Sequence, residues 1–449
     1  MEVLNTIVEY IFSFEPYVVL PIIIFVISLF FQISVSKALR SSLTIGIGFI
    51  GIFIILAYFV EKIGPAVESL TARTGLEYKV LDVGWPPLAA ISWSYYLAPL
   101  LIVLIIMVNM IMLGLKKTRT VNVDIWNFWH FIFLAKMVHV VTNNIILAAT
   151  SALLLSIVTI KLADWSARRV NKFANLSGIS ITTLSGVVYY PVALIGDKLL
   201  SKVKFLNKID ADPEYLKEKL GLIGEPMVIG FILGIFLGIG AGYDLKGVLE
   251  LAFSIAAVIY ILPIMAGVLG KGLMQISEGM KEFIKDKFPD SKEIYIGLDL
   301  AILLGNPSII VTGILLMPAA LLLAFVIPGV NFLPLGDLTN TIAAVSMVVV
   351  AVRGNILRSF IIFIPIMIGK LLVASKMAGM YTDLAEEANF NFQGYDGLIT
   401  GFLDGGNLFR YWFLKLFESQ IWAFFLIPVV CYLLWYTKKS SENDLQPGK

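Results

Sequence analysis

The sequence contains few charged residues for its length. Charged residues make up only 15% of the 449 residues, whereas hydrophobic residues make up 58%, and the mean hydropathy is +0.88. A soluble chain of this length could not solvate so much apolar surface. The scarcity of charge therefore excludes a soluble globular protein and predicts a polytopic membrane protein.

Cysteine and histidine are scarce as well. The single cysteine, Cys431, lies in the last apolar run, which excludes an intrachain disulfide and a cysteine cluster for metal, and two histidines are too few for a metal site. The phosphate-binding Gly-x-x-x-x-Gly-Lys-Ser/Thr loop and the dinucleotide fingerprint are missing. The first residues carry Glu2 and Glu9 instead of a basic region, so we expect no cleavable signal peptide. We expect no metal, no cofactor and no nucleic-acid partner.

Long apolar runs, in contrast, are abundant. Those long enough to cross a bilayer lie near residues 17–35, 42–60, 96–114, 121–141, 143–160, 226–241, 247–269, 311–327, 338–352, 356–375 and 419–436. They predict an all-α fold of about eleven transmembrane helices, with five in each half of the chain and one at the C-terminal end.

The two halves of the chain carry the same short motifs in the same order. The matching pairs are Glu15-Pro16 and Glu225-Pro226, Lys37 and Lys246, Asp124 to Asn127 and Asp337 to Asn340, Asn144-Ile145 and Asn355-Ile356, and Lys161-Leu162 and Lys370-Leu371. Their offset stays close to 210 residues. Ordered duplication in an apolar chain is typical of secondary transporters, whose two repeats enclose a site near the membrane midplane. Since five spans is an odd number, we predict that the second repeat is inverted.

Charged residues between the runs predict the orientation. The linker 161–208 has eight Lys/Arg against two Asp/Glu, and the segment 377–418 has six acidic against two basic residues. The positive-inside bias then places the linker in the cytoplasm, the N-terminus outside and the C-terminus in the cytoplasm of a bacterial-type plasma membrane. The apolar stretch 177–197 could span the membrane, re-enter it or lie in its interface, and a span there would break this parity.

Two short segments, 82–87 and 297–308, occupy corresponding places in the halves and combine a carboxylate with Gly and Pro. Irregular backbone at membrane depth is tolerated only where protein or a water-filled cavity satisfies it. We therefore predict re-entrant hairpins near 82–95 and 297–310 that face each other across a cavity, with ordinary loops as the alternative. The predicted divisions are a first repeat (1–165), a cytoplasmic or interfacial linker (166–217), a second repeat (218–376), and a C-terminal part with an outer segment, the last span and a cytoplasmic tail (377–449).

Polar side chains within the spans are candidate substrate ligands. Intramembrane ionisable groups are costly and usually face a pathway, although helix capping could explain any one of them. Carboxylate and amide oxygens accept hydrogen bonds from sugar hydroxyls, while indole rings cover the C–H face of the sugar. The predicted substrate-binding residues are Trp85, Asp124, Asn127, His139, Asn143, Asp299, Asn306, Asp337 and Asn340.

Several longer motifs together carry a family resemblance. They are Asp82-Val-Gly-Trp-Pro86, Val121-Asn-Val-Asp-Ile-Trp-Asn127, Gly224-Glu-Pro226, Ala241-Gly-Tyr-Asp-Leu-Lys-Gly-Val-Leu249, Ile296-Gly-Leu-Asp299 and Leu335-Gly-Asp-Leu338. From about residue 5 to residue 436 the chain resembles the galactitol-type membrane component (IIC) of the bacterial phosphoenolpyruvate-dependent sugar phosphotransferase system, in the ascorbate/galactitol superfamily. The resemblance implies a homodimer in which a mobile core carries the hairpins past a scaffold in an elevator-like displacement. It also implies that a separate cytoplasmic IIB protein, itself loaded by IIA, donates phosphate from a cysteine.

The resemblance implies that a polyol hydroxyl attacks the phosphocysteine of IIB and that the charged product cannot return through an apolar path. A general base would assist that attack. Asp337 and Asp299 are the predicted catalytic residues, with Asp124 as a further candidate. Two alternatives remain open, namely an ion-coupled polyol or sugar symporter, in which the same aspartates would bind a proton or sodium ion, and a passive channel.

Overall fold

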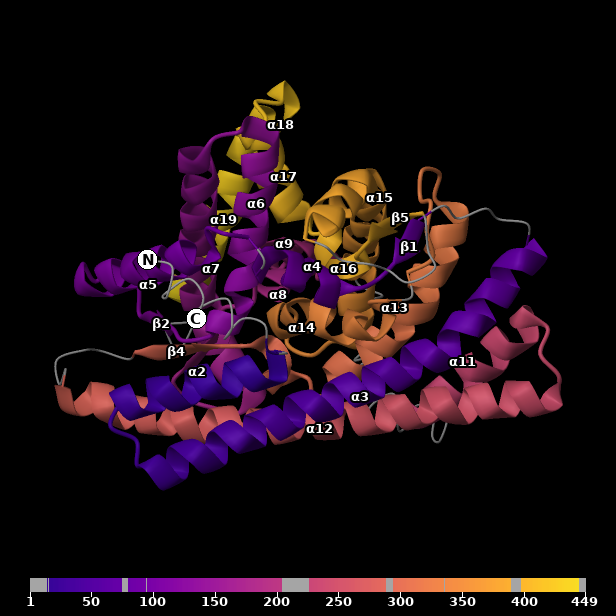
Figure 1. The fold of residues 1–449 in the computed structure, drawn as a ribbon, viewed down its shortest axis with the longest axis horizontal. Helices are drawn as coiled ribbons and strands as arrows, with labels where there is room; N and C mark the ends of the chain where they lie inside the picture. Colours follow the sequence, from indigo (N-terminus) through magenta and orange to yellow (C-terminus); the bar gives the residue numbers. More distant parts are fainter. Residues whose placement is uncertain are drawn as a thin grey trace.

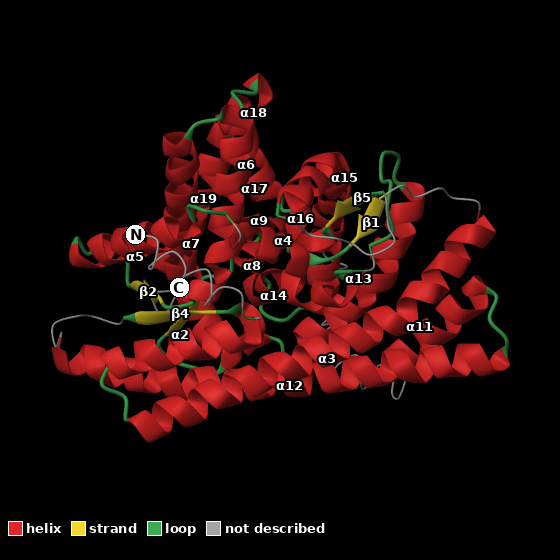
Figure 2. Cartoon of the chain, in the orientation of Figure 1, coloured by secondary structure: helices red, strands yellow, loops and turns green. Residues whose placement is uncertain are grey.

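The computed structural model describes residue 14 and residues 16–74, 80–93, 95–203, 226–287, 294–334, 336–388 and 397–443. Most of this part of the chain is helical, as predicted, and short strands form two small sheets that an all-α fold did not anticipate (Figure 2). The strands arise where the chain runs through the protein interior between helices, because the backbone there must find hydrogen-bond partners in other segments.

Four helices form a layer along one side of the molecule (Figure 1). They are α2 (Pro16–Phe30), α3 (Val35–Thr74), α11 (Pro226–Ala241) and α12 (Leu245–Lys287). At a rise of about 1.5 Å per residue, α3 with its 40 residues and α12 with its 43 are far longer than the predicted spans near 42–60 and 247–269. Gly272 allows their close packing, since a Cβ there would lie 2.8 Å from the carbonyl oxygen of Ser41.

The remaining helices form the rest of the described structure. The longer ones are α5 (Ala98–Gly114), α6 (Trp129–Thr142), α7 (Ile145–Ala174), α13 (Pro307–Val326), α14 (Thr341–Ala351), α15 (Ile356–Glu387), α17 (Leu408–Phe417) and α19 (Ile427–Asn443), the last preceded by α18 (Ile421–Phe425). Within the described ranges, four helical segments are long and apolar enough to cross a membrane, namely Ile145–Ala174, Pro307–Val326, Ile356–Glu387 and Ile421–Asn443. The run near 121–141 is not one helix, since it begins with a strand and the 3-10 helix η1 (Ile125–Phe128).

Both small sheets are parallel and join segments from the two halves of the chain. Strand β1 (Val80–Asp82) pairs with β5 (Leu398–Thr400), so that Asp82 lies opposite Thr400. In the other sheet β4 (Tyr295–Leu298) lies between β2 (Thr120–Asn122) and β3 (Ile179–Ile181). Each sheet thus brings a segment of one half against a segment of the other.

Several short helices lie between the longer elements, most of them in the segments that follow the strands. They are α4 (Trp85–Trp93), α8 (Leu184–Val187), α9 (Tyr190–Leu200), η3 (Leu300–Leu303), η4 (Leu338–Asn340) and α16 (Phe402–Gly405). The stretch 177–197 is therefore a strand followed by two short helices, with Leu184 and Tyr190 buried. Parts of the expected linker 166–217 and outer segment 377–418 contribute to the packed interior.

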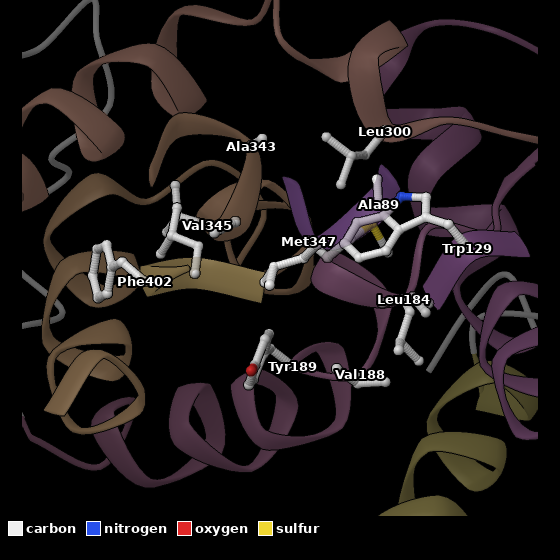
Figure 3. Packing of buried hydrophobic residues seen from close by; sticks show 14 of the residues in the cluster. Ala89, Trp129, Leu184, Val188, Tyr189, Leu300, Ala343, Val345, Met347 and Phe402 are labelled. Carbon is white, nitrogen blue, oxygen red and sulfur yellow. The ribbon is translucent and has the colours of Figure 1, made fainter. Parts of the chain in front are cut away.

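Apolar side chains from these short helices form one core with α6 and α14. Figure 3 shows Trp129, Leu184, Val188, Leu300 and Met347 in this core, contributed by segments far apart in the sequence. Gly186 in α8 permits the contact, because a Cβ there would lie 3.2 Å from both Leu300 and Met347. The core therefore holds the strand-to-helix turns, which carry the polar groups described next, in fixed positions.

Candidate functional site

Asp82 and Asp337 are buried and connect three loops through backbone hydrogen bonds. Oδ1 of Asp82 accepts from the N–H of Gly84 (3.2 Å) and of Phe402 (2.8 Å), and its Oδ2 accepts from the N–H of Asp337 (3.3 Å). Oδ1 of Asp337 accepts from Trp85 N–H (2.9 Å), and its Oδ2 accepts from Leu403 N–H (3.2 Å). We call Asp82 and Asp337 the amide-locked pair.

These loops approach closely because glycines stand at the contact. Gly84 has φ of +74°, and a Cβ there would lie 2.8 Å from the carbonyl oxygen of Gly336. At Gly336 a Cβ would meet the backbone of Asp82 and of Gly84. Glycine is required here because any side chain would separate the loops and break the amide bonds to the carboxylates.

Asp124 and Asp299 form a second carboxylate pair, bridged by an amide. The side-chain N–H groups of Asn127 donate to Oδ2 of Asp124 and to Oδ2 of Asp299. Oδ2 of Asp299 also accepts from the hydroxyl of Thr183 (3.1 Å), and its Oδ1 accepts from Ala301 N–H (2.6 Å). We call Asp124 and Asp299 the bridged pair. Its ligands are side chains rather than only backbone amides, so it can exchange partners with a hydroxylated ligand.

Two tryptophans come from the segments that carry the pairs. Trp85 follows the Asp82 loop, Trp129 follows η1 at the start of α6, and their rings stack with centroids 6.3 Å apart. Trp129 is buried whereas Trp85 is half-buried. The stacked tryptophans are connected to both pairs, because the backbone N–H of Trp85 donates to Asp337 and Trp129 follows Asn127 by two residues. Carboxylates together with indole rings suit a ligand that has hydroxyl groups on an apolar carbon frame.

Buried cations adjoin the carboxylates. Nζ of Lys370 donates to the carbonyl oxygen of Leu403 (2.7 Å), and the guanidinium of Arg410 donates to that of Asp404. The carboxylate of Asp404 interacts electrostatically with Arg410, Lys370 and Asp299. The five aspartates of this region are called the acidic centre below, and they are Asp82, Asp124, Asp299, Asp337 and Asp404.

The structure brings some predicted site residues together and not others. Asp124, Asn127 and Asp299 meet directly, and Trp85 contacts Asp337 through its backbone N–H. His139 and Asn143 lie at the far end of α6, where Asn143 has φ of +49° and ends the helix.

The last two predicted ligands lie at helix starts. The side chain of Asn306 accepts from Ser308 N–H (2.9 Å) at the start of α13, and Asn340 precedes α14. Substrate contacts of His139, Asn143, Asn306 and Asn340 stay predictions.

Asp337, a predicted substrate ligand and catalytic residue, has both carboxylate oxygens bound by backbone amides. Its contact with substrate stays a prediction. Sequence reasoning missed Asp82, Thr183, Lys370, Asp404 and Arg410 as site residues. The available signals were Lys370 within an otherwise apolar run and Asp404 within the glycine-rich segment 401–406. The described part of the chain contains no group of three or more His, Cys, Asp or Glu side chains that could hold a metal ion.

Comparisons with known proteins identify the family of the chain. Residues 10–396 match the family described as "PTS system sugar-specific permease component". The chain is 33% identical to the "PTS system galactitol-specific EIIC component" of Escherichia coli (strain K12), over 96% of this chain and 94% of that protein, and equally to the protein of the same name from Escherichia coli O157:H7. It is also 34% identical, over 89% of its length and 91% of the relative, to an Escherichia coli (strain K12) protein whose name mentions a permease IIC component and no substrate.

Proposed function

Because this chain belongs to the sugar-specific permease components (IIC) of the phosphotransferase system, we propose that it carries galactitol or a related polyol across the inner membrane, coupled to phosphorylation by a separate IIB protein. The bridged pair carries this proposal, together with the stack of Trp85 on Trp129, which follows the bridging Asn127 by two residues. Carboxylate and amide groups there match hydroxyls, and the indole faces match the carbon frame of a polyol.

Asp299 is our choice for the general base, with Asp124 as its partner. Asp299 is half-buried, and its Oδ2 is held by the Thr183 hydroxyl and the Asn127 amide, which a substrate hydroxyl can replace. The substrate oxygen would attack the phosphorus of the IIB phosphocysteine, its proton would pass to the carboxylate, and the sulfur–phosphorus bond would break to release the thiolate. Asp337 is less suited to this role because backbone amides occupy both of its oxygens.

An inverted duplication is the second part of the proposal. Strand β1 of the first half pairs with β5 of the second, and β4 of the second half pairs with β3 of the first, which is the reciprocal pairing expected of repeats related by a two-fold axis. Asp82 ends β1 and Asp299 follows β4. We place the equivalent regions at 80–200 and 294–417, with about eleven spans in the whole chain.

The duplicated Asp-x-x-Asn motifs support this assignment. The backbone N–H of Asn127 donates to the carbonyl oxygen of Asp124 (3.1 Å), and that of Asn340 donates to Asp337 (2.9 Å). Asp124 belongs to the bridged pair and Asp337 to the amide-locked pair. Each motif thus supplies one aspartate to one of the pairs. The other aspartate of that pair, Asp299 or Asp82, lies at or directly after the end of a strand.

We further propose an elevator-like mechanism. The α2, α3, α11 and α12 layer would act as the scaffold, and the elements that carry the acidic centre would act as the mobile core (Figure 1). A homodimer is part of this proposal, as are an N-terminus outside and a C-terminus in the cytoplasm. A row of exposed apolar residues on α3, which are Val35, Leu39, Leu43, Ile47 and Ile54, suits contact with lipid or with a second copy.

Uptake by right-side-out vesicles tests the function. Vesicles loaded with phosphoenolpyruvate and the soluble phosphotransferase components should accumulate galactitol as a phosphate. Asp299→Asn should lower the phosphorylation rate by about 100-fold or more, with a smaller effect on binding. The control is Asp244→Asn. Asp244 is exposed and accepts a hydrogen bond from Gly247 N–H, which an asparagine oxygen can also accept. This variant should behave as the wild type. Accumulation of unmodified polyol driven by an ion gradient alone would contradict the proposal and favour a symporter.

A further inference from the structure

The turn between α16 and α17 carries a polar pair, Asp404 of the acidic centre and Asn407, to which the proposed function assigns no role. Asp404 is 4% exposed and Asn407 is 1% exposed. The two belong to one turn, in which the backbone N–H of Asn407 donates to the carbonyl oxygen of Asp404 (3.3 Å). Within the described part of the chain, neither Oδ1 of Asp404 nor Nδ2 of Asn407 has a hydrogen-bond partner.

Other groups in this turn are satisfied. Lys370 and Arg410 donate to the carbonyl oxygens of Leu403 and Asp404, and Oδ1 of Asn407 accepts from Arg410 N–H (3.0 Å) as the cap of α17. His130 Nδ1 lies 3.8 Å from Oδ1 of Asp404, beyond hydrogen-bond distance. Hydrogen bonds therefore fix the turn, while Oδ1 of Asp404 and Nδ2 of Asn407 lack a hydrogen-bond partner in the described part of the chain.

A buried polar atom without a partner is costly, so such atoms point to a missing ligand or to a functional role. One free acceptor and one free donor on the same turn complement a hydroxyl group, which both donates and accepts. An ionised phosphoryl group has no hydrogen to donate, so it cannot satisfy the free acceptor of Asp404. The pair therefore fits a neutral hydroxylated ligand.

The polar pair also breaks the proposed duplication. The residues before α8 and α9, Thr183 and Tyr189, correspond to those before α16 and α17, Gly401 and Asn407. With this alignment, Gly186 and Tyr189 occupy the positions of Asp404 and Asn407. The pair is thus present in one repeat only. This is expected of a subsite that binds one end of a ligand.

We propose that Asp404 and Asn407 form a hydroxyl-binding subsite that determines which polyol this permease accepts. The inference rests on the proposed function and extends the substrate site beyond the bridged pair. In this proposal one polyol molecule meets Asp299 and the Asp404–Asn407 turn at different hydroxyls. Because neither atom is exposed in this conformation, binding requires the core to open around the turn.

Equilibrium binding of radiolabelled galactitol to the purified full-length protein tests this subsite, with single-deoxy analogues as competitors. Asp404→Asn removes the charged acceptor, and Asn407→Ser removes the amide donor while keeping a cap oxygen for α17. Each variant should bind galactitol about tenfold or more weakly than the wild type. Each should lose much less affinity for the deoxy analogue that lacks the contacted hydroxyl, whereas Asp244→Asn should match the wild type.

The outcomes separate this inference from the proposed function. A wild type that binds no polyol would overturn the proposed function together with this subsite. A wild type that binds galactitol, with Asn407→Ser and Asp404→Asn binding it equally well, would overturn the subsite alone. An equal loss for galactitol and for every deoxy analogue would show a purely structural role and would also overturn it. If Asp404→Asn fails to fold, the analogue series with Asn407→Ser decides.

Discussion

Trp85 and Asp337 lie 252 residues apart in the sequence, yet the backbone N–H of Trp85 donates a 2.9 Å hydrogen bond to Oδ1 of Asp337. The other oxygen of Asp337 accepts from Leu403 N–H at 3.2 Å. One buried carboxylate therefore fastens loops from three parts of the chain. Because backbone amides bind both of its oxygens, we expect Asp337 to stabilise the fold rather than to act as the general base.

Asp337→Asn should destabilise the protein. Asparagine is isosteric but offers one acceptor instead of two, so its NH2 group must face the N–H of Trp85 or of Leu403. The loss of a hydrogen bond to a charged acceptor should lower the free energy of unfolding by about 1–3 kcal/mol. A thermal melt of the purified protein, with Asp244→Asn as control, measures this. A variant with the wild-type melting temperature that binds polyol but no longer supports phosphorylation would contradict it and would restore Asp337 as the base.

Gly336→Ala should prevent the loops of the amide-locked pair from meeting. The added Cβ would lie 2.5 Å from the backbone nitrogen of Gly84 and also against the carbonyl oxygen of Asp82. Backbone atoms cannot move aside as flexible side chains can, so the yield of folded protein should fall sharply. Gly114→Ala is the matched control, because nothing lies within 4 Å of a Cβ at that position. Equal yields of monodisperse protein for the two variants in size-exclusion chromatography would refute the requirement for glycine.

The orientation can be tested at the two ends of the last helical segment. In a Cys431→Ser background, which removes the single native cysteine, a cysteine is introduced by Gln420→Cys or by Lys438→Cys. Both positions are exposed. A membrane-impermeant maleimide should label Gln420→Cys in right-side-out vesicles and Lys438→Cys only in inverted vesicles, since the basic C-terminal end is expected in the cytoplasm. The reverse pattern would place the C-terminus outside.

The sequence by itself determined the class of the protein. Hydropathy and scarce charge identified a multi-pass membrane protein, and the motifs around Asp82, Asp124 and Asp299 identified the family, because both signals are local and need no knowledge of contacts. The motif Asp124 to Asn127 was also sufficient to suggest that these side chains belong to one site. Helix lengths were less predictable, since α3 and α12 continue far past their apolar runs once packed against each other.

Only the tertiary structure decided which aspartates are bound by backbone amides alone and which are also bound by side chains. Asp82 accepts from Phe402 N–H across 320 residues of sequence, and hydropathy reports the average environment of a segment but not the donor that a distant loop will present. The short strands escaped prediction for the same reason, because their hydrogen bonds lie between the halves of the chain. Asp299 and Asp337 look alike in sequence. When the two halves come together, Asp299 gains side-chain partners in Asn127 and Thr183, whereas backbone amides bind both oxygens of Asp337.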